Sequence, residues 1–149
     1  MRETRRICGR YRMAREDVIE GARFDDGIAR SGYFIDIHAP SGTSDPHAQR
    51  DAGGRTIGVQ PGFKPKRYYE IPFRCLQPEG VDNLLVACRA MSTTFEAHAA
   101  TRVMGTMHAV GEAAGRAAAL AHRQHVVLGD VDGAAVRRAV GYLDEPLGF

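Results

Sequence analysis

The sequence predicts an α+β fold, in which a mixed sheet carries one long helix packed on it. Three observations predict this class. Residues 5–13 alternate apolar and arginine side chains with the period of a half-buried strand. Residues 104–122 repeat small and apolar side chains at helical spacing. The chain has 149 residues, 44% apolar and 26% charged, which suits one domain with a buried core.

The predicted elements are strands in the first half and helices in the second. In chain order they are a strand over 5–13, a short helix over 16–22 with acidic residues in its first turn, a strand over 32–40 stopped by a proline, a long surface loop over 41–66, a strand over 67–76, a fully buried strand over 81–89, a long helix over 104–122, and a weaker helix over 133–143. Asp132 is placed to cap the last of these helices.

Composition excludes several classes of protein. The net charge is only +2, and no aromatic platform accompanies the N-terminal arginines, so nucleic-acid binding is not expected. No apolar run approaches the roughly 18 residues of a membrane span, and the charged start does not resemble a signal peptide. Three separated cysteines without a CxxC motif indicate free thiols and a cytoplasmic location. His122 and His125 lack further ligands nearby in the sequence, so no metal site is expected.

The segment "RVMGTMHAVGEAAG", residues 102–115, spaces its small residues along one side of a helix. These are Gly111, Ala114 and Gly115, continued by Ala118 and Ala119. Glu112 and Arg116 exclude a membrane dimer motif. Two interpretations remain: close packing against another element, or a helix whose N-terminus faces an anionic or electron-rich ligand.

Three stretches together resemble a known family. They are "RETRRICGRYRMAREDV", "GYFIDIHAP" and "YYEIPFRCLQPEGVDNLLVACRAMSTTFEAHAATRVMGTMHAVGEAAGRAAAL". They are similar, in this order, to the C-terminal part of FAD-dependent oxidoreductases with two dinucleotide-binding motifs. The fold implied is part of an FAD/NAD(P)-binding α/β flavoprotein. The implied units are a substrate-side sheet region over 1–80, the terminal strand and helix of the FAD-binding region over 81–122, and a C-terminal helix and tail over 123–149, within a single unit over 1–149.

The resemblance also implies which residues lie near the cofactor. The residues that correspond to the flavin-binding strand, loop and helix are Ala87, Cys88, Arg89, Arg102, Val103, Met104, Gly105, Thr106 and Gly111. Two of them depart from the family pattern: Cys88 replaces a usual glycine, and Gly105 stands where many relatives have proline. A side chain at residue 88 puts cofactor contact there in doubt, and glycine at residue 105 leaves the loop less rigid.

On the substrate side, the candidate catalytic residues are Arg5, Arg6 and His38. The resemblance implies that Arg5 or Arg6 approaches the substrate side of the flavin and binds an anionic group. His38 and Asp36 form either an acid–base pair or a structural polar pair at a strand end. The competing interpretation of the arginines is a solvated strand face. Glu96 and His98 are further candidates to line the site.

The fingerprint GxGxxG of the family's N-terminal portion is absent from the sequence. We therefore expect the chain to be a C-terminal fragment or subunit of an FAD-dependent oxidoreductase that acts on a small organic substrate. We expect it to bind FAD weakly or not at all by itself, to be inactive alone, and to need an N-terminal FAD-binding half. Apolar surface left exposed would favour a homo-oligomer. The alternative is a non-catalytic module that self-associates or binds a partner subunit.

Overall fold

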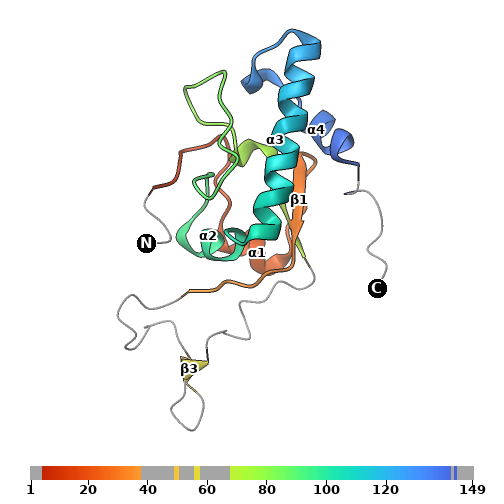
Figure 1. Ribbon diagram of the computed structural model, residues 1–149. Coiled ribbons are helices and arrows are strands. Elements are labelled where there is room, and N and C mark those ends of the chain that lie inside the picture. Colours follow the sequence, from red (N-terminus) through yellow and green to blue (C-terminus); the bar gives the residue numbers. More distant parts are fainter. Residues whose placement is uncertain (1–4, 38–48, 51–55, 58–67, 142, 144–149) are drawn as a thin grey trace.

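A two-stranded antiparallel sheet and a long helix organise the chain (Figure 1). The computed structural model describes residues 5–37, 49–50, 56–57, 68–141 and 143. The elements are α1 (Arg15–Glu20), β1 (Gly27–Ser31), β2 (Gln49–Arg50), β3 (Thr56–Ile57), β4 (Tyr69–Pro72), the 3₁₀ helix η2 (Phe73–Cys75), α2 (Phe95–Thr101), α3 (Met104–Gln124), the 3₁₀ helix η3 (Leu128–Asp130) and α4 (Gly133–Val140). The predicted α+β class is confirmed.

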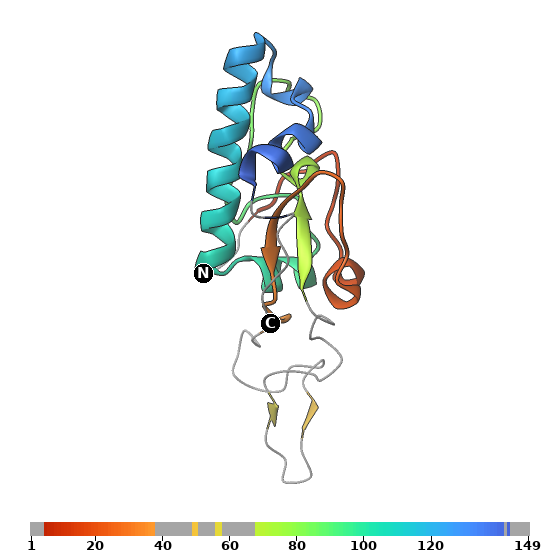
Figure 2. The same cartoon turned by 90° about the vertical axis from the view of Figure 1, so that its right-hand side faces the viewer.

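Strands β1 and β4 form the central ladder, and α3 runs along it (Figure 2). The strands pair antiparallel, with Ala29 opposite Ile71 and Ser31 opposite Tyr69. The second ladder, β2 with β3, is also antiparallel. The mixed pairing that we expected is therefore not seen among the described strands. The long helix does pack on the sheet, as predicted, and α4 packs beside it.

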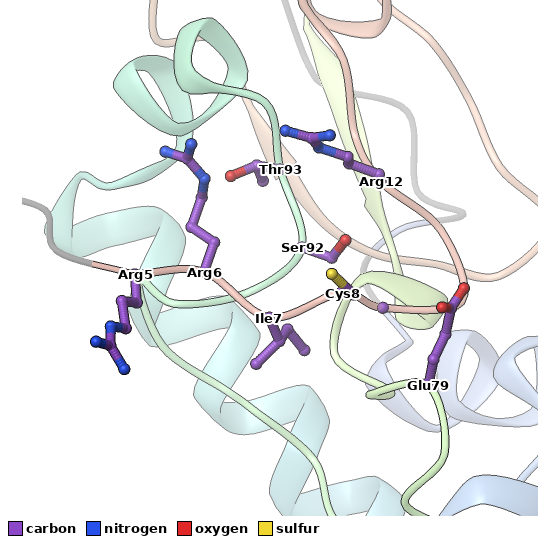
Figure 3. A pocket seen from close by; sticks show the side chains of 9 residues that line it. Arg5, Arg6, Ile7, Cys8, Arg12, Glu79, Ser92 and Thr93 are labelled. Carbon is purple, nitrogen blue, oxygen red and sulfur yellow. The ribbon is translucent and has the colours of Figure 1, made fainter.

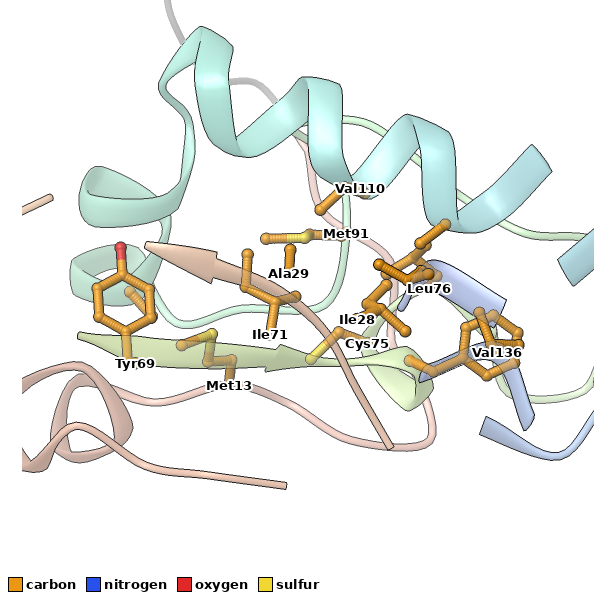
Figure 4. Close-up of a cluster of buried hydrophobic side chains, with 14 of the residues drawn as sticks. Met13, Ile28, Ala29, Tyr69, Ile71, Cys75, Leu76, Met91, Val110 and Val136 are labelled. Atoms are coloured by element: carbon orange, nitrogen blue, oxygen red, sulfur yellow. The ribbon is translucent and has the colours of Figure 1, made fainter. Parts of the chain in front are cut away.

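The core lies between the sheet and α3 (Figure 4). The buried face of α3 consists of Thr106, Val110, Ala113, Ala117 and Ala121, which recur every three or four residues. Its alanines occupy little volume, so that the helix can lie close to its neighbours.

Three predicted strands are not strands in the structure. Residues 5–13 are extended, but they make only isolated bridges, Gly9 with Pro78 and Met13 with Thr93. Residues 32–37 are not a strand either, because the ladder begins earlier, in β1, and pairing ends where Ser31 meets Tyr69 at the start of β4. Residues 81–89 form no ladder, and Val81 and Leu84 are each 46% exposed.

The observed helices agree with the predicted helices more closely than the strands do. The observed α1 and α3 lie within about two residues of the predicted bounds, as expected for helix ends. Asp132 caps α4, where its carboxylate accepts hydrogen bonds from the backbone N–H groups of Ala134 and Ala135 at 3.0 and 3.2 Å. The short helix α2 was not predicted. Most of the predicted loop 41–66 lies outside the described residues, apart from the β2–β3 ladder.

Candidate functional site

Two extended segments lie side by side and position most of the candidate site. The N-terminal segment 5–13 donates a hydrogen bond from Ile7 N to Ala90 O at 2.8 Å and another from Met13 N to Ser92 O at 3.2 Å. In the opposite direction, Thr94 N donates a hydrogen bond to Met13 O at 2.8 Å. Segment 88–94 thus lies against the arginine-rich segment through backbone hydrogen bonds, which require no regular strand.

A glycine makes this close approach possible. A Cβ atom on Gly9 would lie 2.7 Å from Ser92 Cβ and 3.1 Å from the carbonyl oxygen of Arg74. Real Cβ atoms do not approach neighbours so closely. Any other residue at this position would push the two segments apart.

A cavity of about 390 Å³ opens between these segments (Figure 3). It is lined by Arg5, Arg6, Ile7, Cys8, Gly9, Arg12, Glu79, Ser92 and Thr93. Three of these side chains are cationic and one is anionic, so the lining attracts negatively charged groups. The sequence had singled out Arg5 and Arg6, and the structure places both in this lining.

The charges around Arg6 act on its pKa. Burial is the largest influence and lowers the pKa of Arg6, and the nearby Arg12 lowers it further, while Glu96 raises it. A lowered pKa means that the surroundings disfavour the cation. An additional negative charge in the cavity would stabilise the Arg6 cation and raise its pKa.

His98, on α2, lies where three arginines converge. It is 2% exposed, and its pKa is lowered to about 4. Burial is the main cause, followed by the positive charges of Arg6, Arg102 and Arg89, while a hydrogen bond with the backbone of Arg89 opposes them. At neutral pH the imidazole is therefore uncharged.

The structure thus brings Arg6, Arg89 and Arg102 around one buried histidine, although the sequence assigned them to two different roles. Arg102 is held by Asp36, whose backbone oxygen accepts a hydrogen bond from Arg102 Nη2 at 2.9 Å. The Asp36 carboxylate lies 4.0 Å from the same nitrogen. The other candidate, His38, lies outside the described residues, so its expected pairing with Asp36 stays a prediction.

The first turn of α3 carries the residues that the resemblance places at the flavin. Val103 is the N-cap residue and its side chain makes no capping hydrogen bond. Met104 is 76% exposed, and a Cβ on Gly105 would meet nothing within 4 Å. Thr106 differs from these, because it is buried and its hydroxyl bonds to the Ser31 hydroxyl at 3.1 Å. Backbone groups of this turn are therefore open, whereas the Thr106 side chain is already engaged.

Most of the remaining cofactor candidates are exposed. Ala87 is half-buried, and Cys88, Arg89 and Gly111 are exposed. The Cys88 sulfur accepts a hydrogen bond from Ala90 N at 3.4 Å, which turns it back onto its own loop. All three cysteines are free thiols. Cys88 therefore does not project from the loop as an unrestrained side chain.

Among the lining residues, only Arg5 and Arg6 were predicted from the sequence. Ser92 and Thr93 were not, although they are 0% and 1% exposed. Their burial depends on contact with segment 5–13, which is far away in the sequence.

Among the residues that the structure describes, no helix combines the length and the apolar character that a membrane crossing requires.

Comparison with known proteins agrees with the resemblance. The family model for FAD dependent oxidoreductase matches residues 1–140. No curated protein and no solved structure gives a match. Because the family match spans nearly the whole sequence, the chain belongs to the FAD dependent oxidoreductase family.

Proposed function

We propose that this chain supplies the flavin-facing loop and helix, and part of the substrate site, of an FAD-dependent oxidoreductase. A portion with the GxGxxG fingerprint completes the FAD site, whether it belongs to the same polypeptide or to a partner subunit. The observation that carries the proposal is the open N-terminus of α3 at the residues that the family resemblance assigns to the flavin.

The residues of this turn fit the cofactor. The first N–H groups of a helix have no partners within the helix, and they carry a partial positive charge. In α3 no side chain caps them, no acidic residue occupies the first turn, and the space beside Gly105 is open. An electron-rich ring edge could therefore approach these groups from the open side beside Gly105.

When bound, FAD supplies the redox chemistry by accepting a hydride from an organic substrate. The first turn of α3 would stabilise the negative charge that develops on the ring, because its N–H groups are fixed in position before the reaction. Thr106 would act as a positioning residue, since its hydrogen bond to Ser31 fastens this turn to β1. Arg89 and Arg102 add positive charge that acts on His98.

A second function is favoured by a different observation. Val81, Leu84, Phe95 and Met104 are between 46% and 76% exposed, and exposed apolar side chains are a common feature of protein interfaces. The chain would then be a module that self-associates or binds a partner subunit without performing chemistry itself.

Co-expression with a half that carries the GxGxxG fingerprint distinguishes the two proposed functions. We expect the completed protein to purify yellow and to retain flavin absorbance through gel filtration, whereas this chain alone should lose it. If the completed protein carries no flavin and added FAD does not raise its melting temperature, the oxidoreductase proposal fails and the interaction module remains.

A matched pair of variants tests the role of α3 directly. Val103→Asn and Val103→Asp both add a helix cap, but only the second adds a negative charge. We expect Val103→Asp to lower the flavin reduction potential relative to Val103→Asn by about 20 mV, which corresponds to about 1 kcal/mol for two electrons. Equal potentials in the two variants would place the flavin away from this helix end.

A further inference from the structure

The cavity between segments 5–13 and 88–94 contains two buried hydroxyl groups that nothing in the described structure satisfies. Ser92 Oγ and Thr93 Oγ1 have no hydrogen-bond partner among the described residues, although both side chains are at most 1% exposed. Buried polar groups in native proteins almost always have a partner. Two consecutive exceptions in the lining of one cavity therefore point to a ligand.

The backbone around these hydroxyls is already engaged. Ser92 N donates to Cys75 O at 2.9 Å, and Ser92 O accepts from Met13 N at 3.2 Å. The backbone of Ser92 is therefore engaged, whereas the hydroxyls of Ser92 and Thr93 remain to be satisfied. Each can donate one hydrogen bond and accept others.

The cationic side chains determine the kind of ligand. Figure 3 shows the guanidinium groups of Arg6 and Arg12 near Thr93, with the Thr93 hydroxyl turned toward Arg6. The positive charge of Arg12 is also one cause of the lowered pKa of Arg6. Guanidinium groups have only donors and match the paired oxygens of carboxylates and phosphates.

We propose that this cavity binds an oxyanion, a carboxylate or phosphate group, between Arg6 and Arg12. The hydroxyls of Ser92 and Thr93 donate hydrogen bonds to its oxygens. The volume of about 390 Å³ accommodates a small organic molecule around that group. Glu79 also lines the cavity, but on the side of Cys8, whose backbone oxygen accepts a hydrogen bond from Glu79 N at 2.9 Å.

The oxyanion has two chemical sources in an enzyme of this kind. It is either an acidic group of the substrate or the pyrophosphate of the cofactor. If the oxyanion is an acidic group of the substrate, the inference specifies the substrate class of the proposed function and rests on that function. Binding of an oxyanion by this chain does not itself depend on flavin. The test therefore measures anion binding and FAD binding separately.

The experiment titrates the full chain with inorganic phosphate, succinate and pyrophosphate at constant ionic strength in chloride, followed by calorimetry and melting temperature. We expect saturable binding of at least one of these anions. Arg6→Gln and Arg12→Gln should each weaken it about tenfold or more, because each removes charge-assisted hydrogen bonds. Arg116→Gln, on the exposed face of α3, should leave the affinity unchanged.

The hydroxyls allow a sharper test, because removing an unsatisfied hydroxyl should not cost stability. Without anion, we expect Thr93→Val to melt at or above the wild-type temperature and yet to lose most of the stabilisation by anion. Thr101→Val is the matched control: Thr101 is buried and its hydroxyl bonds to His98 O at 3.5 Å, outside the cavity. It should melt lower and keep the full anion response.

The proposal is overturned if the wild-type chain shows no saturable anion binding, or if Arg12→Gln and Thr93→Val respond to the anions as the wild type does. Should Thr93→Val fail to fold, Arg12→Gln, whose side chain is exposed, decides the result. In the flavin-loaded completed protein, phosphate binding that persists identifies a substrate pocket, and binding that is lost identifies the cofactor pyrophosphate. Absence of flavin with intact anion binding would refute the proposed function alone.

Discussion

Glu70 stays charged although it is buried in β4. Burial is the strongest influence on it and raises its pKa, but hydrogen bonds from Arg137, the Phe24 backbone and Arg30 together hold the pKa below its usual value. Arg137 contributes two bonds, at 2.8 and 3.2 Å. These contacts attach α4 to the sheet through Glu70, which is 1% exposed.

We expect Glu70→Gln to lower the free energy of unfolding by about 3 to 5 kcal/mol, because it leaves the positive charge of Arg137 without its buried partner. Urea denaturation at pH 7 measures this. Glu112→Gln is the control, since Glu112 pairs with Arg116 on the exposed face of α3, and its loss should cost about 0.5 kcal/mol or less. Equal losses in the two variants would contradict the structural role of Glu70.

His98 makes the fold sensitive to acid. Its pKa is near 4 in the folded chain and about 6.5 when unperturbed, so the unfolded chain takes up the proton first as the pH falls. The contribution of His98 to stability is therefore complete above about pH 6.5 and is lost between about pH 6.5 and 4, at no more than about 1.4 kcal/mol per pH unit.

We expect His98→Gln to flatten the dependence of unfolding free energy on pH in this interval, because glutamine does not titrate. Denaturant unfolding at several pH values measures the slope. His122→Gln, at an exposed position of α3, should keep the wild-type slope. An unchanged slope in His98→Gln would show that other groups cause the sensitivity.

At the scale of elements, α3 has a second face that the described residues leave uncovered. Gly111, Gly115, Ala118 and Ala119 are exposed, and a Cβ on either glycine would meet nothing within 4 Å. Glycine inside a helix costs about 1 kcal/mol relative to alanine. The packing of the described residues therefore gives no reason for these glycines, and close packing within the chain, one interpretation of their spacing, is not what the described structure shows.

We expect Gly111→Ala and Gly115→Ala each to raise the unfolding free energy of this chain by about 0.5 to 1 kcal/mol. Thermal denaturation checks this. Gly9→Ala is the opposite control, since its Cβ would lie 2.7 Å from Ser92 Cβ and should destabilise the chain by about 1 to 3 kcal/mol. Destabilisation by the α3 substitutions would mean that the exposed face is covered in solution.

The molecule as a whole presents apolar side chains on the loop 81–90, α2 and the start of α3. Val81, Leu84, Phe95 and Met104 are the exposed members. We expect the chain by itself to form dimers or larger assemblies at micromolar concentration, because association removes this surface from water. Light scattering measures the mass, and Leu84→Lys should shift the distribution toward monomer. A wild-type chain that is monomeric throughout would refute this.

The sequence determined those parts of the fold that depend on neighbours along the chain. The spacing of α3, the Asp132 cap and the strand character of residues 69–72 are local patterns, and the structure confirms all three. The predicted strand over 67–76 is shorter than expected, because residues 73–75 form a 3₁₀ helix. The predictions for 5–13, for 81–89 and for residues 32–37 of the strand expected over 32–40 were wrong, because a strand needs a partner and apolar alternation does not reveal whether one is present.

The candidate site, like the fold, was predicted from the sequence only in part. The sequence identified Arg5 and Arg6 and, through the family, the first turn of α3. Only the tertiary structure placed Ser92 and Thr93 unsatisfied beside those arginines and brought Arg6, Arg89 and Arg102 around His98. Burial and charge proximity arise from contacts between distant segments, and residue order alone does not contain the distances that decide them.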